Sequence, residues 1–152
     1  MTEPLHRTRR VEALAAAPAD RLLPLAERAL AASDGEADPG RPPLRAVHPP
    51  EVGTVTMTVR EPVERTRFLL ADVLVTRCEI EHRATRAWAM RIGDDREATL
   101  AAAILDAETE AGGPLAADVE ALCRAVHHRQ AADRSAEWDE LAPTVVSFEE
   151  MN

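Results

Sequence analysis

Residues 67–92, RFLLADVLVTRCEIEHRATRAWAMRI, decide the fold of this chain. The side chains of this stretch alternate, with Leu74, Thr76, Cys78 and Ile80 on one side and Val73, Val75, Arg77, Glu79 and Glu81 on the other. A period of two is typical of a β-strand, so we predict a strand over residues 67–81, with an interruption near Ala71. A turn at Arg83 and Ala84 leads into a second alternating run, residues 85–92. Strands joined by so short a turn are antiparallel.

A further strand is expected on the N-terminal side of this stretch. Between residues 54 and 59, Val55, Met57 and Val59 alternate strictly with threonines. This pattern predicts a strand with one buried face and one exposed face.

Helical patterns lie before and after the strands. Residues 7–16 and 20–32 carry apolar residues at helical spacing, and Pro24 is expected in the first turn of the second helix. After Gly93 the period changes again, and Asp94 with Glu97 resembles a capping box that begins a third helix. Gly112 and Gly113 end that helix, a last helix begins at Pro114, and Pro143 begins an extended tail.

This order of elements predicts a single α+β domain over residues 1–152. Its antiparallel sheet of three to five strands is covered by N- and C-terminal helices. Residues 1–32 form a helical front and residues 33–43 a linker rich in proline, glycine and acids. Residues 44–92 form the sheet, and residues 94–152 form helices and the extended tail.

The composition excludes several classes of function. All 18 basic residues are arginine, so a Schiff base, a pyridoxal-phosphate anchor and a P-loop lysine are excluded. A net charge of -9 opposes binding to nucleic acid. No apolar run approaches the roughly 18 residues that cross a bilayer, and the polar start MTEPLHRTRR lacks a secretory signal. We therefore expect a cytoplasmic protein that binds neither nucleic acid nor membrane, with Cys78 and Cys123 as thiols.

The sheet region is locally basic. Residues 60–91 hold seven arginines against five acids, a net charge of +2. Such a surface could receive a phosphorylated ligand or an acidic partner. Cross-strand ion pairs, such as Glu81 with Arg86, explain any single arginine better.

No set of residues in the sequence indicates catalysis or metal binding. Cys123 and His127 are spaced to share a helical face, but a zinc site needs more ligands. His6, His48 and His82 have no nearby nucleophile or carboxylate that would mark a triad. We therefore assign no catalytic residue, no metal site and no cofactor.

The motif VTRC at residues 75–78 resembles the central motif of the PhnG family, a subunit of the bacterial phosphonate carbon–phosphorus lyase core complex. Around it, that family shows a PExGLVMVRGR segment, a GRD turn, an alanine-rich helix containing LLDAL and a VDFFTM tail. The matching positions here are Pro50, Glu51, Gly53, Arg60, Phe68, Gly93, Asp95, Ile104, Leu105, Asp106, Ala107, Val146, Phe148 and Met151. The resemblance spans the chain and is continuous over residues 50–107.

This resemblance implies a non-catalytic subunit that assembles with H-, I- and J-type subunits. The assembly replaces the adenine of ATP with a phosphonate and yields ribose 1-phosphonate 5-triphosphate. The I-type subunit would be the nucleosidase and the J-type subunit the radical lyase with its iron–sulfur cluster. The residues expected to bind a partner or ligand are Arg77, Thr76, Glu51, Arg60 and Asp95, and the expected interface anchors are Phe68, Trp88 and Phe148.

The chain also departs from the family pattern. Asp94 stands at the arginine of GRD, Ala98 at a histidine of the following helix, and Thr58 at the arginine of RG. Two other classes stay open beside the subunit: an independent enzyme that binds a small ligand on the arginine-rich sheet, and a diverged interaction module without a role in phosphonate metabolism. Which phosphonate is used, and whether these departures change activity, is left open by the sequence.

Overall fold

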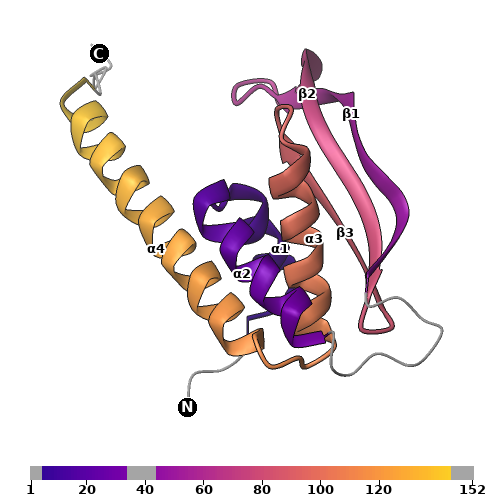
Figure 1. Cartoon of the computed structure of the whole chain (residues 1–152). Helices are drawn as coiled ribbons and strands as arrows, with labels where there is room; N and C mark the ends of the chain where they lie inside the picture. The colour runs from indigo at the N-terminus through magenta and orange to yellow at the C-terminus, as the bar shows by residue number, and fades with distance from the viewer. Residues whose placement is uncertain (1–4, 34–43, 145–152) are drawn as a thin grey trace, which may run out of the picture.

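The structure is a computed structural model, which describes residues 5–33 and 44–144. Three strands form one antiparallel sheet in the order β1–β2–β3, with the helices on one side of it (Figure 1). The elements are α1 (Arg7–Ala16), α2 (Ala19–Ser33), β1 (Leu44–Arg60), β2 (Arg67–His82), β3 (Thr85–Ile92), α3 (Arg96–Glu110), α4 (Ala116–Leu141) and the 3-10 turn η1 (Ala142–Thr144). The predicted α+β class is confirmed.

The hairpin of β2 and β3 forms as its alternation predicts. Arg83 and Ala84 both adopt the left-handed conformation, with φ of 49° and 61°, which suits the twist of a two-residue hairpin turn. The inner face of β2 is buried against α3 through Thr76, Cys78, Ile80 and His82. The side that carries Leu74, Thr76, Cys78 and Ile80 is therefore buried from Thr76 onward, while Leu74 is 47% exposed.

The first strand differs from its prediction in length and burial. It covers residues 44–60 rather than 54–59, because β2 supplies partners from His82, opposite Leu44, to Arg67, opposite Arg60. The prediction that one face of this strand is buried is wrong, since Val55 and Met57 are 38% and 40% exposed. This end of β1 and β2 extends past β3, whose pairing with β2 stops at Val75.

The interruption expected near Ala71 is a β-bulge within a continuous strand. Met57 pairs with Ala71 and Thr58 with Leu69, so Leu70 has no partner in the register. A bulge of this kind bends the strand and increases its twist without ending the pairing.

Four helix boundaries also differ from the predictions, and one of them is the start of α4, which is Ala116 rather than Pro114. Helix α2 begins at Ala19, so Pro24 lies inside the helix rather than in its first turn. The N-cap of α3 is Asp95, one residue later than expected, and its side chain accepts from the backbone N–H of Ala98. At the C-terminal end, η1 follows α4 where an extended tail was expected, and Thr144 Oγ1 donates to the carbonyl of Leu141. The rest of the predicted tail and residues 34–43 of the predicted linker lie outside the described residues.

Helix α3 lies between the sheet and the other helices (Figure 1). Every residue from Ala98 to Glu108 is buried except Leu100, which is partly buried. Five of the buried residues are alanines, at positions 98, 101, 102, 103 and 107. Small side chains let the helix approach β2 and β3 on one side and α1, α2 and α4 on the other. The core is therefore formed around one helix that is apolar on nearly all sides.

A buried carboxylate holds the C-terminal end of α3 to the hairpin turn. Glu108 is fully buried and accepts from Arg83 Nε at 2.7 Å and from the backbone N–H of Leu115 at 3.0 Å. His82 Nε2 lies 3.2 Å from the same carboxylate. A buried charge needs such partners, and these come from β2, from the turn and from the start of α4.

The close approach of Gly113 to Glu108 leads to a first prediction. A Cβ at position 113 would overlap the Glu108 carboxylate, which its hydrogen bonds hold in place. We expect Gly113→Ala to lower the free energy of unfolding by about 2 kcal/mol, measured by urea denaturation. Gly53→Ala is the matched control, because a Cβ there meets open space. Equal effects of the two substitutions would contradict this account.

Candidate interaction surface

Two of the predicted binding residues, Thr76 and Asp95, lie where the sheet meets α3. Thr76 is fully buried, and its Oγ1 donates to the carbonyl of Gly93 at 2.6 Å and accepts from the N–H of Asp95 at 3.1 Å. The Asp95 carboxylate caps α3 by accepting from the N–H of Ala98 at 3.0 Å. These contacts fix the start of α3 against β2. A binding role for either residue stays a prediction.

Arg77 and Glu51 lie on the sheet face opposite α3 and form an ion pair. Arg77 Nη2 is 2.7 Å from Glu51 Oε1, and both side chains are more than half exposed. Further pairs on this face join Arg86 to Glu79 at 2.7 Å and Arg45 to Glu81 at 2.8 Å. Exposed pairs contribute little stability. The arginines of this face are thus already bound to carboxylates, as cross-strand pairing predicts.

Arg60 and Phe68 lie at the far end of the hairpin formed by β1 and β2. Arg60 pairs with Arg67 in the register, and Phe68 with Val59. Phe68 is 46% exposed. Phe148, the third predicted anchor, lies outside the described residues. The predicted residues therefore fall into separate places: the α3 junction, the open sheet face and the end of the hairpin.

The aromatic side chains in the described part of the chain lie on the surface. The chain has two tryptophans and two phenylalanines, of which Phe68, Trp88 and Trp138 lie in the described part. They are 46%, 58% and 62% exposed. Aromatic rings bury the largest apolar areas in most cores and are enriched at protein interfaces. Here the core consists of alanine, leucine, valine and isoleucine, and the rings are available for contacts outside it.

Trp88 stands between two hollows in the surface. On one side, a hollow of about 190 Å³ lies between α1 and β3 and is almost entirely apolar. Its walls include Val11, Leu14 and Ala15 from α1, Trp88, Ala89 and Met90 from β3, and Ala102 and Asp106 from α3. On the other side, Trp88 and Met90 border a hollow of about 310 Å³ that also includes Arg77 and Glu79. The structure thus brings the predicted anchor Trp88 next to the predicted binding residue Arg77.

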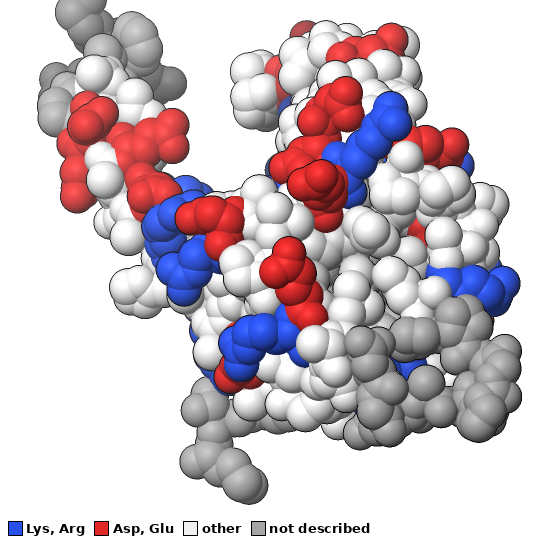
Figure 2. All heavy atoms as spheres, in the orientation of Figure 1, with Lys and Arg blue, Asp and Glu red and all other residues white. Residues whose placement is uncertain are grey.

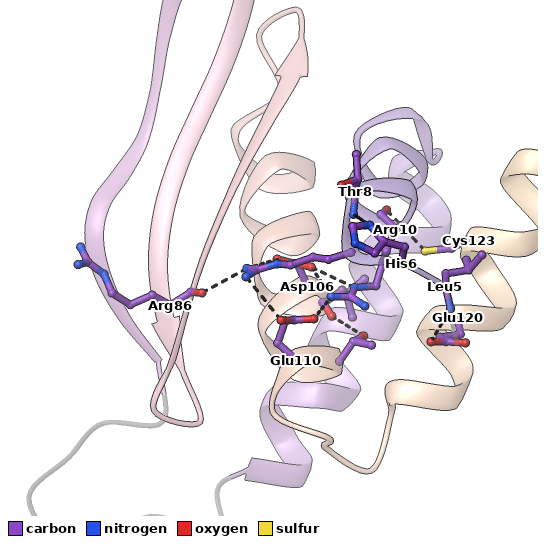
Figure 3. A network of polar contacts seen from close by, with 12 residues as sticks. Leu5, His6, Thr8, Arg10, Arg86, Asp106, Glu110, Glu120 and Cys123 are labelled. Carbon is purple, nitrogen blue, oxygen red and sulfur yellow. Dashed lines mark hydrogen bonds and ion pairs between the residues drawn. The ribbon is translucent and has the colours of Figure 1, made fainter. Parts of the chain in front are cut away.

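A buried ionic network between α1 and α3 includes Asp106, which lines the first hollow (Figure 3). Arg10 Nε donates to Asp106 Oδ1 at 3.0 Å, and Arg7 Nη2 donates to Asp106 Oδ2 at 2.7 Å. Both arginines also pair with Glu110. Arg10 and Asp106 are 3% and 1% exposed, so the network joins α1 to α3 within the core. The hydrogen bond from Arg7 to Asp106 raises the pKa of Arg7.

The side chain of Arg91 fixes the other end of α1 to β3. Its guanidinium donates to the carbonyls of Leu14, Ala15 and Ala17 at 2.7, 2.8 and 2.9 Å. These are carbonyls of the last helical turn, which have no partner within the helix. Burial lowers the pKa of Arg91. The position of α1, and hence the wall of the hollow, depends on this contact and on Asp106.

Sequence reasoning missed both of these contacts. One feature could have indicated a role for Asp106: it lies among the alanines of α3, and a buried carboxylate there needs a hydrogen-bond or ionic partner. No local pattern indicated that the partner would be Arg10, because the two residues are 96 positions apart.

The Asp106 network yields a second prediction. Asp106→Ala leaves the buried Arg10 without one of its two carboxylates, so we expect a loss of about 3 kcal/mol in the free energy of unfolding. Asp118→Ala removes the carboxylate of an exposed pair with Arg28 and is expected to cost less than about 0.5 kcal/mol. Chemical denaturation of both variants measures the difference. A mild effect at Asp106 would show that the network adds little.

The two cysteines are buried thiols. Burial raises the pKa of Cys78 to about 11 and that of Cys123 to about 12. His127, which was spaced to meet Cys123, has its Nε2 2.9 Å from the carbonyl of Arg9. In residues 5–33 and 44–144 no three histidine, cysteine or acidic side chains are placed to hold a metal ion.

A third prediction concerns these thiols. A thiol is reactive as the thiolate, and both groups stay protonated near neutral pH because their pKa values are raised. We expect neither cysteine to react with a chromogenic disulfide reagent in the folded protein within minutes, and both to react in denaturant. Rapid labelling of the native protein would contradict the burial of these residues.

Acidic side chains gather on the far half of α4. This half projects away from the rest of the molecule, and Figure 2 shows its carboxylates. Residues 131–142 are all exposed. Among them, Asp133, Glu137, Asp139 and Glu140 outnumber the single basic residue, Arg134. No helix in the described ranges is long and apolar enough to cross a membrane.

Comparison with protein-family models finds a match to the family described as phosphonate metabolism protein PhnG, over residues 5–152. This chain belongs to the PhnG family. No curated protein matches the chain. Membership connects this PhnG-family chain to phosphonate metabolism and confirms the resemblance carried by the VTRC region.

The departures from the PhnG pattern fall in three different environments. Ala98, at the histidine position, is fully buried in the first turn of α3. Asp94, at the arginine of GRD, is exposed and lies 3.7 Å from Arg96. Thr58 is exposed near the end of the hairpin and pairs with Leu69. The first change therefore affects the core and the other two the surface.

Proposed function

We propose that this PhnG-family chain is a non-catalytic subunit of the carbon–phosphorus lyase core complex. Its partners would be the H-, I- and J-type subunits, and its assembly would be required for the replacement of the adenine of ATP by a phosphonate. The product of that step would be ribose 1-phosphonate 5-triphosphate. The observation that carries the proposal, beside family membership, is that all three described aromatic residues are exposed while the core is aliphatic.

The buried reactive groups favour a subunit over an independent enzyme. His82 and Glu108 form an acid–imidazole pair, but both side chains are fully enclosed and therefore out of reach of a substrate. The thiols of Cys78 and Cys123 are likewise buried. On the open sheet face, Arg45, Arg77 and Arg86 are bound to carboxylates, which weakens the case for a phosphate site there.

Trp88 is the best placed anchor for a partner. It is exposed, it stands between two hollows, and the network of Asp106 and Arg91 holds the α1 wall beside it. Tryptophan is enriched among residues that dominate binding energy, particularly where rigid pockets surround it. The neighbouring Arg77 and Glu51 would form part of the polar rim, where charges guide association more than they strengthen it.

The proposal is tested by co-expression of this chain with the H-, I- and J-type subunits of its own organism. A stable complex in size-exclusion chromatography, and adenine release from ATP and a phosphonate only when this chain is present, are expected. Adenine release by the isolated chain would support the independent enzyme. If no complex forms and no adenine is released, the result supports the diverged interaction module.

A fourth prediction concerns Trp88 in that complex. We expect Trp88→Ala to weaken assembly roughly 30-fold, the effect of losing about 2 kcal/mol at an interface anchor. Arg77→Ala is expected to weaken it less, because Arg77 is largely exposed. Arg21→Ala, on the exposed side of α2, is the control and is expected to bind as the original chain does. Titration of the purified variants against the I-type subunit measures these affinities, and unchanged binding of Trp88→Ala would exclude it as an anchor.

A further inference from the structure

The outer end of the β1–β2 hairpin, residues 54–74, extends past the part of the sheet that pairs with β3. We refer to it as the ribbon. Residues 67–74 of β2 pair with β1, whereas β3 pairs with β2 from Val75 onward and Gly93, directly after β3, donates to the carbonyl of Leu74 at 2.9 Å. In Figure 1 the ribbon rises beyond the N-terminal end of α3. A two-stranded hairpin without a packed face is marginally stable in water, so this length of ribbon calls for an external contact.

The ribbon carries apolar side chains that nothing in the described chain covers. Their exposed fractions run from 38% at Val55 to 86% at Val63. The set consists of Val55, Met57, Val63, Phe68, Leu69, Leu70 and Leu74. Grouped apolar exposure of this kind marks a surface that contacts another molecule. An uncovered β-ribbon is also an aggregation hazard, which a permanent partner removes.

The charges of the ribbon specify the chemistry of the partner. Arg60, Arg65 and Arg67 are exposed, and none has a carboxylate partner within the described residues. Two of the three acids are engaged locally. Glu61 accepts from the N–H groups of Val63 and Glu64 in the turn, and Asp72 accepts from Thr56 Oγ1 at 2.8 Å. Among the described residues, the three arginines of the ribbon therefore have no carboxylate partner, in contrast to the paired arginines of the sheet face, and they lie among apolar side chains exposed on both faces of the ribbon.

We infer that the ribbon docks into an apolar groove bordered by carboxylates on a partner subunit of the complex. The apolar side chains would fill the groove, and Arg60, Arg65 and Arg67 would pair with the carboxylates at its rim. This inference rests on the proposed function for the existence of the partner. It adds a second contact, separate from the Trp88 surface, and identifies the element that reaches into the partner.

A shortened ribbon tests the inference in the co-expressed complex. Replacing residues 57–71 with Asn-Gly joins Thr56 to Asp72, which already face each other, through a two-residue hairpin turn. The contacts of β2 with β3 and α3 begin beyond this deletion, so the core is kept. Thermal unfolding of the isolated variant shows whether the body is folded. We expect a folded body and loss of the complex.

A charge reversal tests the chemistry of the partner. We expect the triple substitution of Arg60→Glu, Arg65→Glu and Arg67→Glu to weaken binding to the partner roughly tenfold or more. The weakening is expected to be smaller at high salt, because salt screens the charges. The matched control, Arg9→Glu, Arg21→Glu and Arg129→Glu together, changes the net charge equally on the exposed helical side. Equal weakening by the two triple variants would overturn the acidic groove.

The outcomes separate the ribbon from the proposed function. If the original chain and the shortened chain bind equally well, the ribbon inference is overturned and the subunit proposal stands. If the original chain binds none of the subunits, both are overturned.

The far half of α4 carries Trp138 and Leu141 beside its acids, so a second copy of this chain is a competing occupant. If light scattering shows that the original chain is a homodimer and the shortened chain a monomer, the ribbon contacts a second copy of this chain, and the inferred groove on a partner subunit is overturned.

Discussion

The packing of α3 between the sheet and three other helices is the constraint on which the structure depends. Its alanines contribute little volume, so the elements on either side approach the helix axis closely and bury one another's aliphatic side chains. Such a core has little need of large rings. The described aromatic residues are consequently free to serve on the surface, and the interfaces proposed for this chain follow from the small size of the residues in its central helix.

Polar contacts then attach each neighbouring element to a particular point on α3. Thr76 and Asp95 fix its beginning to β2, Asp106 binds α1 in its second half, and Glu108 holds the hairpin turn and the start of α4 near its end. Hydrophobic burial is non-directional and would tolerate sliding of one helix past another. Buried charges do not tolerate it, because a displaced carboxylate loses partners that water cannot replace. The hollow beside Trp88 keeps its shape for this reason.

Two segments extend beyond the reach of this core, the ribbon at one side and the far half of α4 at the other (Figure 1). Both are regular in structure and largely exposed, and they differ in charge: the ribbon carries arginines that have no carboxylate partner among the described residues, and α4 carries an excess of acids. A compact body with extended, charged arms is suited to an assembly in which several neighbours are contacted at once.

The sequence by itself determined the class of fold, the β2–β3 hairpin with its turn, and the glycines that end α3. These depend on local alternation, turn geometry and helix period, all of which are visible within a few residues. The order of motifs around VTRC also determined the family. Tertiary structure alone decided that β1 extends from Leu44 to Arg60, that Val55 and Met57 are exposed, and that Arg10 meets Asp106. An alternating pattern shows that a strand has two different faces, but whether a helix covers either face depends on where distant elements end. Pairing between residues about a hundred positions apart depends likewise on the packed fold, and no local pattern carries it.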